Sequence, residues 1–299
     1  MTDYVATLVS NPSKPALSDA LLSHLAQALP SNAKVIRLDR QIAIDVVFSA
    51  RSQKETKETV EKIRQALASE PIDVIVQPLA TRKKSLFIAD MDSTMIGQEC
   101  IDELAAELRV KQKVAKITER AMRGELEFEQ ALRERVRLLA GLDALVIPKI
   151  IAERITLSPG ARTLISTLRG HGVYTALVSG GFTLFTHRIS AMIGFDEHRA
   201  NTLMIDKGKL TGEVAEPILG KQAKRATLIE LREQFALHPD ETLAIGDGAN
   251  DLDMIKEAGF GVAYRAKAAV AAAADARIEH ADLTALLYAQ GYSRSSWIE

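Results

Sequence analysis

The stretch Lys84-Ser-Leu-Phe-Ile-Ala-Asp90-Met-Asp92-Ser-Thr94 determines how the rest of the chain is interpreted. Its apolar run, 86–89, is typical of a strand buried on both faces of a parallel sheet. Ligands of open α/β sheets bind beyond the carboxyl ends of strands, which is where Asp90 and Asp92 would project. Spaced two residues apart on extended chain, the pair can converge on one metal ion and leave one carboxylate for a substrate. The alternative is a polar loop whose hydroxyl residues cap the next helix.

Length and composition indicate a soluble globular protein. The 299 residues, 47% hydrophobic and 26% charged, suffice for one large domain or two ordinary ones. The formal net charge is −1, without a sustained basic or acidic block, so we expect no nucleic-acid or membrane partner. No signal-peptide pattern or membrane-length apolar run is present. Cys100 is the single cysteine, so no intrachain disulfide can form and we expect a cytoplasmic protein.

Residues 1–80 are predicted to form a separate α+β domain. The pattern predicts strands at 4–10, 35–38, 42–48 and 72–76, with helices at 16–29 and 54–68. This β-α-β-β-α-β order is ferredoxin-like, and by element order it resembles the ACT regulatory module. The loop 10–15 lacks the glycine that many ACT modules use to bind an amino acid, so the resemblance does not extend to that site. We expect a linker at 78–84, and pairing of such sheets would give a homodimer.

From residue 85 onward, strands alternate with helices, and chemically active residues follow two more strands. Strand 175–178 leads into Ser179-Gly180-Gly181, where backbone N–H groups and a hydroxyl can face an anion at a helix N-terminus. An ordinary tight turn is the alternative. Strand 243–245 is followed by Asp247 and Asp251, although Asp251 could instead serve the dipole of the next helix. Lys224 lies near the start of a helix, where a lysine is normally solvated.

The order of these groups matters more than any one of them. Two carboxylates, a hydroxyl-plus-glycine turn, a lysine and further carboxylates would bind a phosphate together with Mg²⁺, which prefers oxygen ligands. This order resembles the haloacid dehalogenase-like phosphotransferases over residues 85 to about 289. Five strings resemble the phosphoserine phosphatases among them: Asp90-Met-Asp-Ser-Thr94 with Glu99, Phe128-Glu-Gln-Ala-Leu-Arg-Glu-Arg135, Ser179-Gly-Gly-Phe182, Gly208-Lys-Leu-Thr-Gly212 and Gly246-Asp-Gly-Ala-Asn-Asp251.

The resemblance implies a Rossmann-like parallel sheet in a domain over 85–299, with a helical cap inserted at about 97–155. It implies Mg²⁺-dependent hydrolysis of O-phosphoserine through an aspartyl-phosphate, which is the last step of serine biosynthesis. Asp90 would be the nucleophile, and Asp92 would be the general acid and base. The resemblance places Mg²⁺ on Asp90, the Asp92 backbone carbonyl and Asp247, oriented by Asp251, and the phosphoryl oxygens on Ser179, Gly180 and Lys224.

The serine part of the substrate is expected to meet the cap. Arg135 shares a helix face with apolar residues, so it either extends to solvent or meets a carboxylate. Glu99 either interacts with a helix dipole or binds an amine. The resemblance favours Arg135 on the substrate carboxylate and Glu99 on its amino group, with Met122, Phe128 and Asn250 also contacting the substrate.

Two alternative functions follow from the same residues. One is a phosphatase or phosphotransferase acting on another small phosphate, such as phosphohomoserine. The other is a regulatory amino-acid-binding protein with a vestigial site, against which the intact Asp90, Asp92, Lys224 and Asp247 argue. Elsewhere the pattern predicts a β-hairpin over 200–214, a helix over 268–274 and a loose tail over 292–299.

Overall fold

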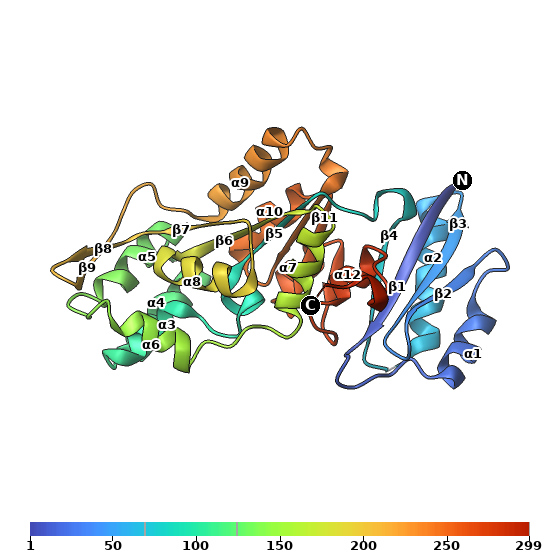
Figure 1. Cartoon of the computed structure of the whole chain (residues 1–299), viewed down its shortest axis with the longest axis horizontal. Coiled ribbons are helices and arrows are strands. Elements are labelled where there is room, and N and C mark those ends of the chain that lie inside the picture. The colour runs from blue at the N-terminus through green and yellow to red at the C-terminus, as the bar shows by residue number, and fades with distance from the viewer. Residues whose placement is uncertain (69, 124, 299) are drawn as a thin grey trace.

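The computed structural model describes residues 1–68, 70–123 and 125–298, and it contains an antiparallel sheet, a parallel sheet and a helical cap (Figure 1). The antiparallel sheet has the strand order β2-β3-β1-β4, which confirms the predicted ferredoxin-like arrangement. Its two helices begin where Ser18 and Ser52 accept backbone hydrogen bonds as N-caps. The elements are β1 (Thr2–Ser10), α1 (Asp19–Ala28), β2 (Lys34–Asp39), β3 (Ala43–Ala50), α2 (Gln53–Leu67) and β4 (Ile72–Pro78).

The parallel sheet has the order β12-β11-β10-β5-β6-β7, and the predicted Rossmann-like core is confirmed. Its central strand, β5, is buried on both faces. Leu86 and Ile88 pack with α9 and α10, whereas Phe87 and Ala89 belong to the larger core that includes α7 and α8. The strands are β5 (Leu86–Ala89), β6 (Tyr174–Phe182), β7 (Glu197–Asn201), β10 (Thr242–Gly246), β11 (Phe260–Tyr264) and β12 (Ala276–Ile278).

Helices cover both faces of this sheet, and α12 lies between it and the antiparallel sheet (Figure 1). The predicted helix over 268–274 is confirmed as α11. The helices are α7 (Ala161–Gly170), α8 (Thr183–Ile193), α9 (Lys221–Gln234), α10 (Leu252–Glu257), α11 (Ala268–Ala273) and α12 (Ala285–Ala289). Short helical turns cover Leu79–Thr81, Met91–Met95, Pro239–Glu241, Ala249–Asp251 and Arg294–Ser296.

The cap joins two segments that are far apart in the sequence. Between β5 and α7 lie α3 (Cys100–Glu107), α4 (Lys111–Met122), α5 (Phe128–Arg137) and α6 (Val146–Glu153). The hairpin of β8 (Leu203–Asp206) and β9 (Lys209–Val214) docks against them, since Gly141 N–H donates to Leu210 O and Leu210 N–H donates to Leu142 O, both at 2.8 Å. The predicted hairpin is therefore present but shorter, because residues up to Asn201 belong to the parallel sheet.

The segment expected to be a linker is instead held firmly between the two sheets. The Arg82 guanidinium donates to both carboxylate oxygens of Asp45, at 2.8 and 3.1 Å, and to the carbonyls of Tyr288 and Ala289. Asp73 accepts backbone N–H groups of residues 279–281. Arg82 and Asp73 thus each have partners on the other side of the interface between the two sheets.

The expectation of a loose tail is also wrong. The Trp297 ring lies 4.9 Å from the ring of Tyr288, centroid to centroid, and Tyr292 is buried. Ile298 N–H donates to Thr167 Oγ1 at 3.0 Å, which ties the end of the chain to α7. The aromatic side chains of this segment therefore pack against the rest of the domain.

Among the described residues, no helix combines the length and the apolar character needed to cross a membrane.

Candidate active site

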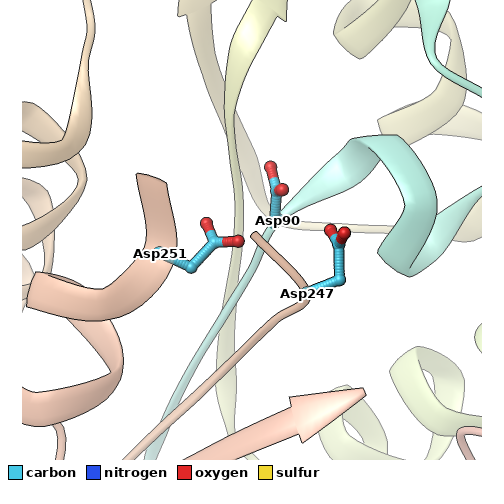
Figure 2. Close-up of side chains that lie close together, drawn as sticks. All are labelled: Asp90, Asp247 and Asp251. Carbon is cyan, nitrogen blue, oxygen red and sulfur yellow. The ribbon is translucent and has the colours of Figure 1, made fainter. Parts of the chain in front are cut away.

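Three carboxylates meet at the carboxyl edge of the parallel sheet. Asp90 follows β5, Asp247 follows β10, and Asp251 lies at the start of α10; Figure 2 shows the three side chains gathered together. β5 pairs directly with β10, so the two strand ends are neighbours. One oxygen from each carboxylate lies within 4.8 Å of the others. Carboxylates this close repel one another unless cations neutralise them.

Lys224 supplies one of those cations. It is fully buried, and its Nζ donates to Asp90 Oδ1 at 2.6 Å and to Asp251 Oδ1 at 2.7 Å. Burial alone would lower the pKa of the ammonium, but the Asp251 and Asp90 carboxylates raise it. Lys224 is therefore a charged residue of the site, and the expectation of a solvated helix face does not hold for it.

The Lys224 ammonium does not compensate all of the negative charge of the three carboxylates. Burial raises the pKa of Asp90 well above its ordinary value, and the Asp251 carboxylate adds to the rise. The same two causes, in the same order, raise the pKa of Asp247 to about 6. Oxygen donors with surplus negative charge are what a divalent cation such as Mg²⁺ requires, so these residues fit a metal ion.

The chain turns sharply after Asp90. Met91 N–H donates to Asp90 Oδ1 at 2.8 Å, and Ser93 adopts a left-handed conformation with φ of 56°. Ser93 Oγ donates to Glu99 Oε1 at 2.7 Å, and α3 begins only after Glu99. The alternative in which hydroxyl residues cap a helix directly after the aspartates is therefore wrong.

β6 continues to Phe182, so Ser179-Gly180-Gly181 form a bulge within the strand rather than a turn after it, and Asp92 faces this bulge. Its Oδ1 accepts from Cys100 N–H at 2.9 Å, and its Oδ2 accepts from Ser179 Oγ at 3.3 Å. Burial raises the pKa of Asp92, although its hydrogen bonds to Cys100 and Ser179 oppose the rise. A raised pKa favours a carboxyl that can hold a proton, as a general acid requires.

The bulge at residues 179–181 of β6 depends on a glycine. A Cβ on Gly181 would lie 2.8 Å from Asp92 Oδ2, so a larger residue would displace the carboxylate. The Gly181 N–H donates to Ser179 Oγ at 2.9 Å, which orients the buried hydroxyl toward Asp92. Gly181 and Ser179 thus contact Asp92 in the site, which the alternative of an ordinary tight turn does not require.

The cap places Phe128 over this bulge. A Cβ on Gly180 would lie 3.3 Å from the Phe128 ring, and a Cβ on Gly220 would lie 3.1 Å from it. An ion pair between Arg133 of α5 and Glu216, after β9, also joins the cap to the segment that leads to α9. The cap is therefore closed against Gly180 and Gly220.

Two charged residues lie on the cap side of the site. Arg135 donates to Ala131 O at 3.2 Å and to Thr118 Oγ1 at 3.5 Å. Burial lowers the pKa of its guanidinium, against the pull of the Glu99 and Asp102 carboxylates. Although water reaches part of Glu99, burial and the Asp92 carboxylate raise its pKa to about 7.

The remaining predicted contacts are less fully defined. Asn250 is half-buried, and its Oδ1 lies beside Gly248, 2.4 Å from where a Cβ would stand. Met122 ends α4, and its side chain lies outside the described part of the chain. The structure thus brings together Asp90, Asp92, Ser179, Lys224, Asp247 and Asp251. Phe128 lies against Gly180, the Glu99 carboxylate interacts with the charges of Asp92 and Asp247, and Arg135 interacts with the charge of Glu99.

Sequence reasoning missed three polar residues beside this group. Thr94 is buried and its Oγ1 donates to Asp247 Oδ1 at 3.3 Å, while Cys100 N–H holds Asp92. Asn201 is buried at the end of β7 and contacts Gly180. The signal for Thr94 was its place in the aspartate motif, whereas a single asparagine at a strand end carries almost none.

Comparison with known proteins agrees with this geometry. The haloacid dehalogenase-like hydrolase family matches residues 87–256. A phosphoserine phosphatase from Streptomyces coelicolor is 39% identical to the chain over 296 residues, covering 97% of this chain and 71% of that protein.

Solved structures agree as well. A probable phosphoserine phosphatase from Vibrio cholerae, in unliganded form, has a TM-score of 0.75 and 31% identity, covering 97% of this chain and 88% of that chain. A phosphoserine phosphatase solved as an analogue of its phospho-aspartyl intermediate has a TM-score of 0.64 and 42% identity. It covers 69% of this chain, and this chain covers 98% of it.

Proposed function

Because this chain belongs to the haloacid dehalogenase-like hydrolases and, among them, to the phosphoserine phosphatases, we propose that it hydrolyses O-phosphoserine to serine and phosphate. The observation that carries this proposal is the buried Asp90. It accepts a hydrogen bond from Lys224 and is grouped with Asp247 and Asp251, while Asp92, two residues further on, accepts a hydrogen bond from Ser179. The groups needed for covalent phosphoryl transfer are thus gathered at one sheet edge.

In the first step, Asp90 attacks phosphorus and the bond from phosphorus to the serine oxygen breaks. Hydrogen bonds from Met91 N–H and Lys224 both go to Oδ1, which leaves Oδ2 as the attacking oxygen. The leaving serine oxygen takes a proton from Asp92, whose raised pKa favours the protonated form. The products of this step are serine and an aspartyl-phosphate on Asp90.

In the second step, water attacks the phosphorus of the aspartyl-phosphate. Asp92 has lost its proton by then, so it can accept one from the water, and Asp90 leaves as a carboxylate. The Ser179 hydroxyl, the Gly180 N–H and the Lys224 ammonium stabilise the phosphoryl oxygens in both steps. Phe128 and the closed cap limit the access of other water.

We assign the divalent ion to Mg²⁺, held by Asp90, Asp247 and the Asp92 backbone carbonyl, with Asp251 orienting that set. Bound there, Mg²⁺ would neutralise charge on the phosphoryl oxygens. The three carboxylate oxygens within 4.8 Å of one another support this assignment, because Mg²⁺ prefers oxygen ligands. Burial first and the Asp251 carboxylate second raise the pKa of Asp90 and of Asp247, which is consistent with a cation being needed there. Thr94 would hold Asp247 in place through its 3.3 Å hydrogen bond.

Arg135 and Glu99 would read the serine part of the substrate. Arg135 is held by two neutral acceptors, Ala131 O and Thr118 Oγ1, so its charge remains available to the substrate carboxylate. Glu99, deprotonated, would receive the amino group, while Phe128, Met122 and Asn250 would complete the contacts. Cytoplasmic localisation and assembly as a homodimer remain predictions from the sequence.

A panel of phosphomonoesters tests this function. Phosphate release is measured from phosphoserine, phosphohomoserine, phosphothreonine and an aryl phosphate, with Mg²⁺ and with excess chelator. We expect phosphoserine to have the highest kcat/KM and chelation to abolish turnover. A higher kcat/KM for phosphohomoserine would reassign the substrate, and inactivity toward every ester would indicate a vestigial site.

A further inference from the structure

Asn201, the last residue of β7, forms hydrogen bonds to two parts of the site. It is 2% exposed, and its Nδ2 donates to Gly180 O at 2.9 Å and to Leu219 O at 3.1 Å. Its Oδ1 accepts from Leu219 N–H at 2.6 Å. Because one backbone N–H and two backbone carbonyls face this amide, only one orientation satisfies all three.

The need for this amide follows from the way β6 pairs with β7. The parallel register runs from Ala176 and Glu197 to Val178 and Arg199, is interrupted, and resumes at Phe182 and Asn201. Residues 179–181 bulge out of the ladder at the interruption, toward the site. A carbonyl that leaves the ladder in such a bulge loses its ladder partner, and Asn201 supplies another donor to Gly180 O.

Fixing the Gly180 carbonyl also fixes the rest of that peptide group. The carbonyl of Gly180 and the N–H of Gly181 share one planar unit, so holding one end orients the other. The Gly181 N–H donates to Ser179 Oγ, and Ser179 Oγ donates to Asp92 Oδ2. Asn201 is therefore the first member of a hydrogen-bond chain that ends on the proposed general acid.

The other two hydrogen bonds of Asn201 act on the lysine side. Leu219 immediately precedes Gly220, and α9 begins at Lys221. Lys224 lies in the first turn of that helix and contacts Asp90. By clamping the Leu219 backbone, Asn201 sets the distance between the Ser179–Gly181 bulge and the start of the helix that carries Lys224.

We propose that Asn201 is a positioning residue that holds the Ser179–Gly181 bulge in register with the start of α9. It acts through Ser179, Asp92 and Lys224, without touching the substrate. The inference rests on the proposed function, since it concerns the geometry around the transferring phosphoryl group. Its effect should therefore be the same for any phosphomonoester, unlike that of residues that read serine.

The test compares Asn201→Ala and Asn201→Asp with the parent chain. The isosteric Asp keeps the acceptor for Leu219 N–H but loses both donors. We expect kcat to fall roughly twofold to 150-fold, the range for one or two lost neutral hydrogen bonds, on phosphoserine and on an aryl phosphate alike. The KM for phosphoserine should change little, and the concentration of beryllofluoride that half-inhibits the enzyme should rise.

Thr175→Val is the matched control. Like Asn201, Thr175 is buried and forms a side-chain hydrogen bond, here to Asp196 at 2.9 Å. It lies near the start of β6, at the opposite end of that strand from the site. This variant should lower the melting temperature but keep the parent kcat and beryllofluoride affinity.

Each outcome decides the proposal. A folded Asn201 variant with parent kcat on both esters contradicts it, as does a loss confined to phosphoserine. If neither Asn201 variant folds while Thr175→Val does, the residue is structural and the proposal is wrong. An inactive parent would refute the proposed function itself, which distinguishes that failure from failure of the inference.

Discussion

The Nζ atom of Lys224 lies 2.6 Å from Asp90 Oδ1, and neither side chain is more than 5% exposed. The same nitrogen forms a hydrogen bond to Asp251 at 2.7 Å, so one ammonium joins α9 to the end of β5 and to the start of α10. A buried ion pair is costly to desolvate, and removing one partner leaves the other charge uncompensated. The pair therefore links the stability of the site directly to its chemistry.

Replacing Lys224 with methionine should harm both properties. Losing one partner of a buried ion pair costs about 3–5 kcal/mol, so the free energy of unfolding should fall by that order in metal-free buffer. Turnover should fall at least about a hundredfold, because a donor to the phosphoryl group is gone. Mg²⁺ should raise the melting temperature more in Lys224→Met than in the parent, since the variant has more uncompensated negative charge.

The control for this prediction is Lys221→Met, an exposed residue in the same helix. It should keep the parent melting temperature and activity. Parent-like activity in Lys224→Met would show that the buried lysine is structural and takes no part in phosphoryl transfer.

Mg²⁺ dependence should change with pH in a defined direction. Without metal, burial and the Asp251 carboxylate raise the pKa of Asp247 to about 6. Protons therefore compete with the cation below pH 6, where the carboxylate is mostly neutral, and competition fades above it. The Mg²⁺ concentration for half-maximal activity should rise as pH falls from 7.5 to 5.5. An Mg²⁺ requirement that is constant over this range would remove Asp247 from the ligand set.

Arg135→Ala should impair phosphoserine hydrolysis selectively. Charge-assisted hydrogen bonds are worth about 1.5–3 kcal/mol, so kcat/KM should fall roughly tenfold to 150-fold. An aryl phosphate without carboxylate or amine should be hydrolysed nearly as before. Glu99→Gln should show the same selectivity with a smaller loss, because the amide can still accept a hydrogen bond.

Arg137→Ala, an exposed change on the same helix, serves as the control and should leave both substrates unaffected. If Arg135→Ala lowers both activities equally in a folded protein, Arg135 supports the cap and does not read serine.

The interface between the sheets should contribute to stability more than to catalysis. Asp45 is buried and pairs with Arg82 at 2.8 Å, so Arg82→Met should cost about 3–5 kcal/mol of unfolding free energy. The exposed Lys83→Met should cost little.

A chain lacking residues 1–80 should keep phosphoserine hydrolysis if it folds, with a lower melting temperature. A folded but inactive fragment would show that the N-terminal unit supports the site.

Features with a local sequence signal could be predicted, whereas features that depend on residues remote in the sequence could not. The run 86–89 predicted β5 because a strand buried on both faces is apolar throughout, and the aspartates after it placed the site. Lys224 could be assigned only through resemblance, because its partners Asp90 and Asp251 are remote in the sequence. The role of Asn201 depends on an interruption of strand pairing that no residue pattern announces.

The linker and the tail were misread for a related reason. Arg82 lies in a segment with the composition of an exposed loop. Its guanidinium nevertheless donates hydrogen bonds to Asp45 and to two carbonyls of α12. Trp297 is one aromatic residue in a polar segment, and its contact with Tyr288 comes from tertiary packing alone. Local propensity does not report partners supplied by another part of the chain.

The central claim is that Asp90 takes the phosphoryl group from phosphoserine. The most direct measurement mixes the chain with phosphoserine and Mg²⁺, quenches in acid during turnover and determines the mass of the peptide that contains Asp90. We predict a fraction of that peptide heavier by one phosphoryl group in the parent. Asp90→Asn should show no such species and no phosphate release, because an amide cannot form the acyl-phosphate. Substantial phosphate release by folded Asp90→Asn, or a phosphoryl group on another residue, would contradict the account.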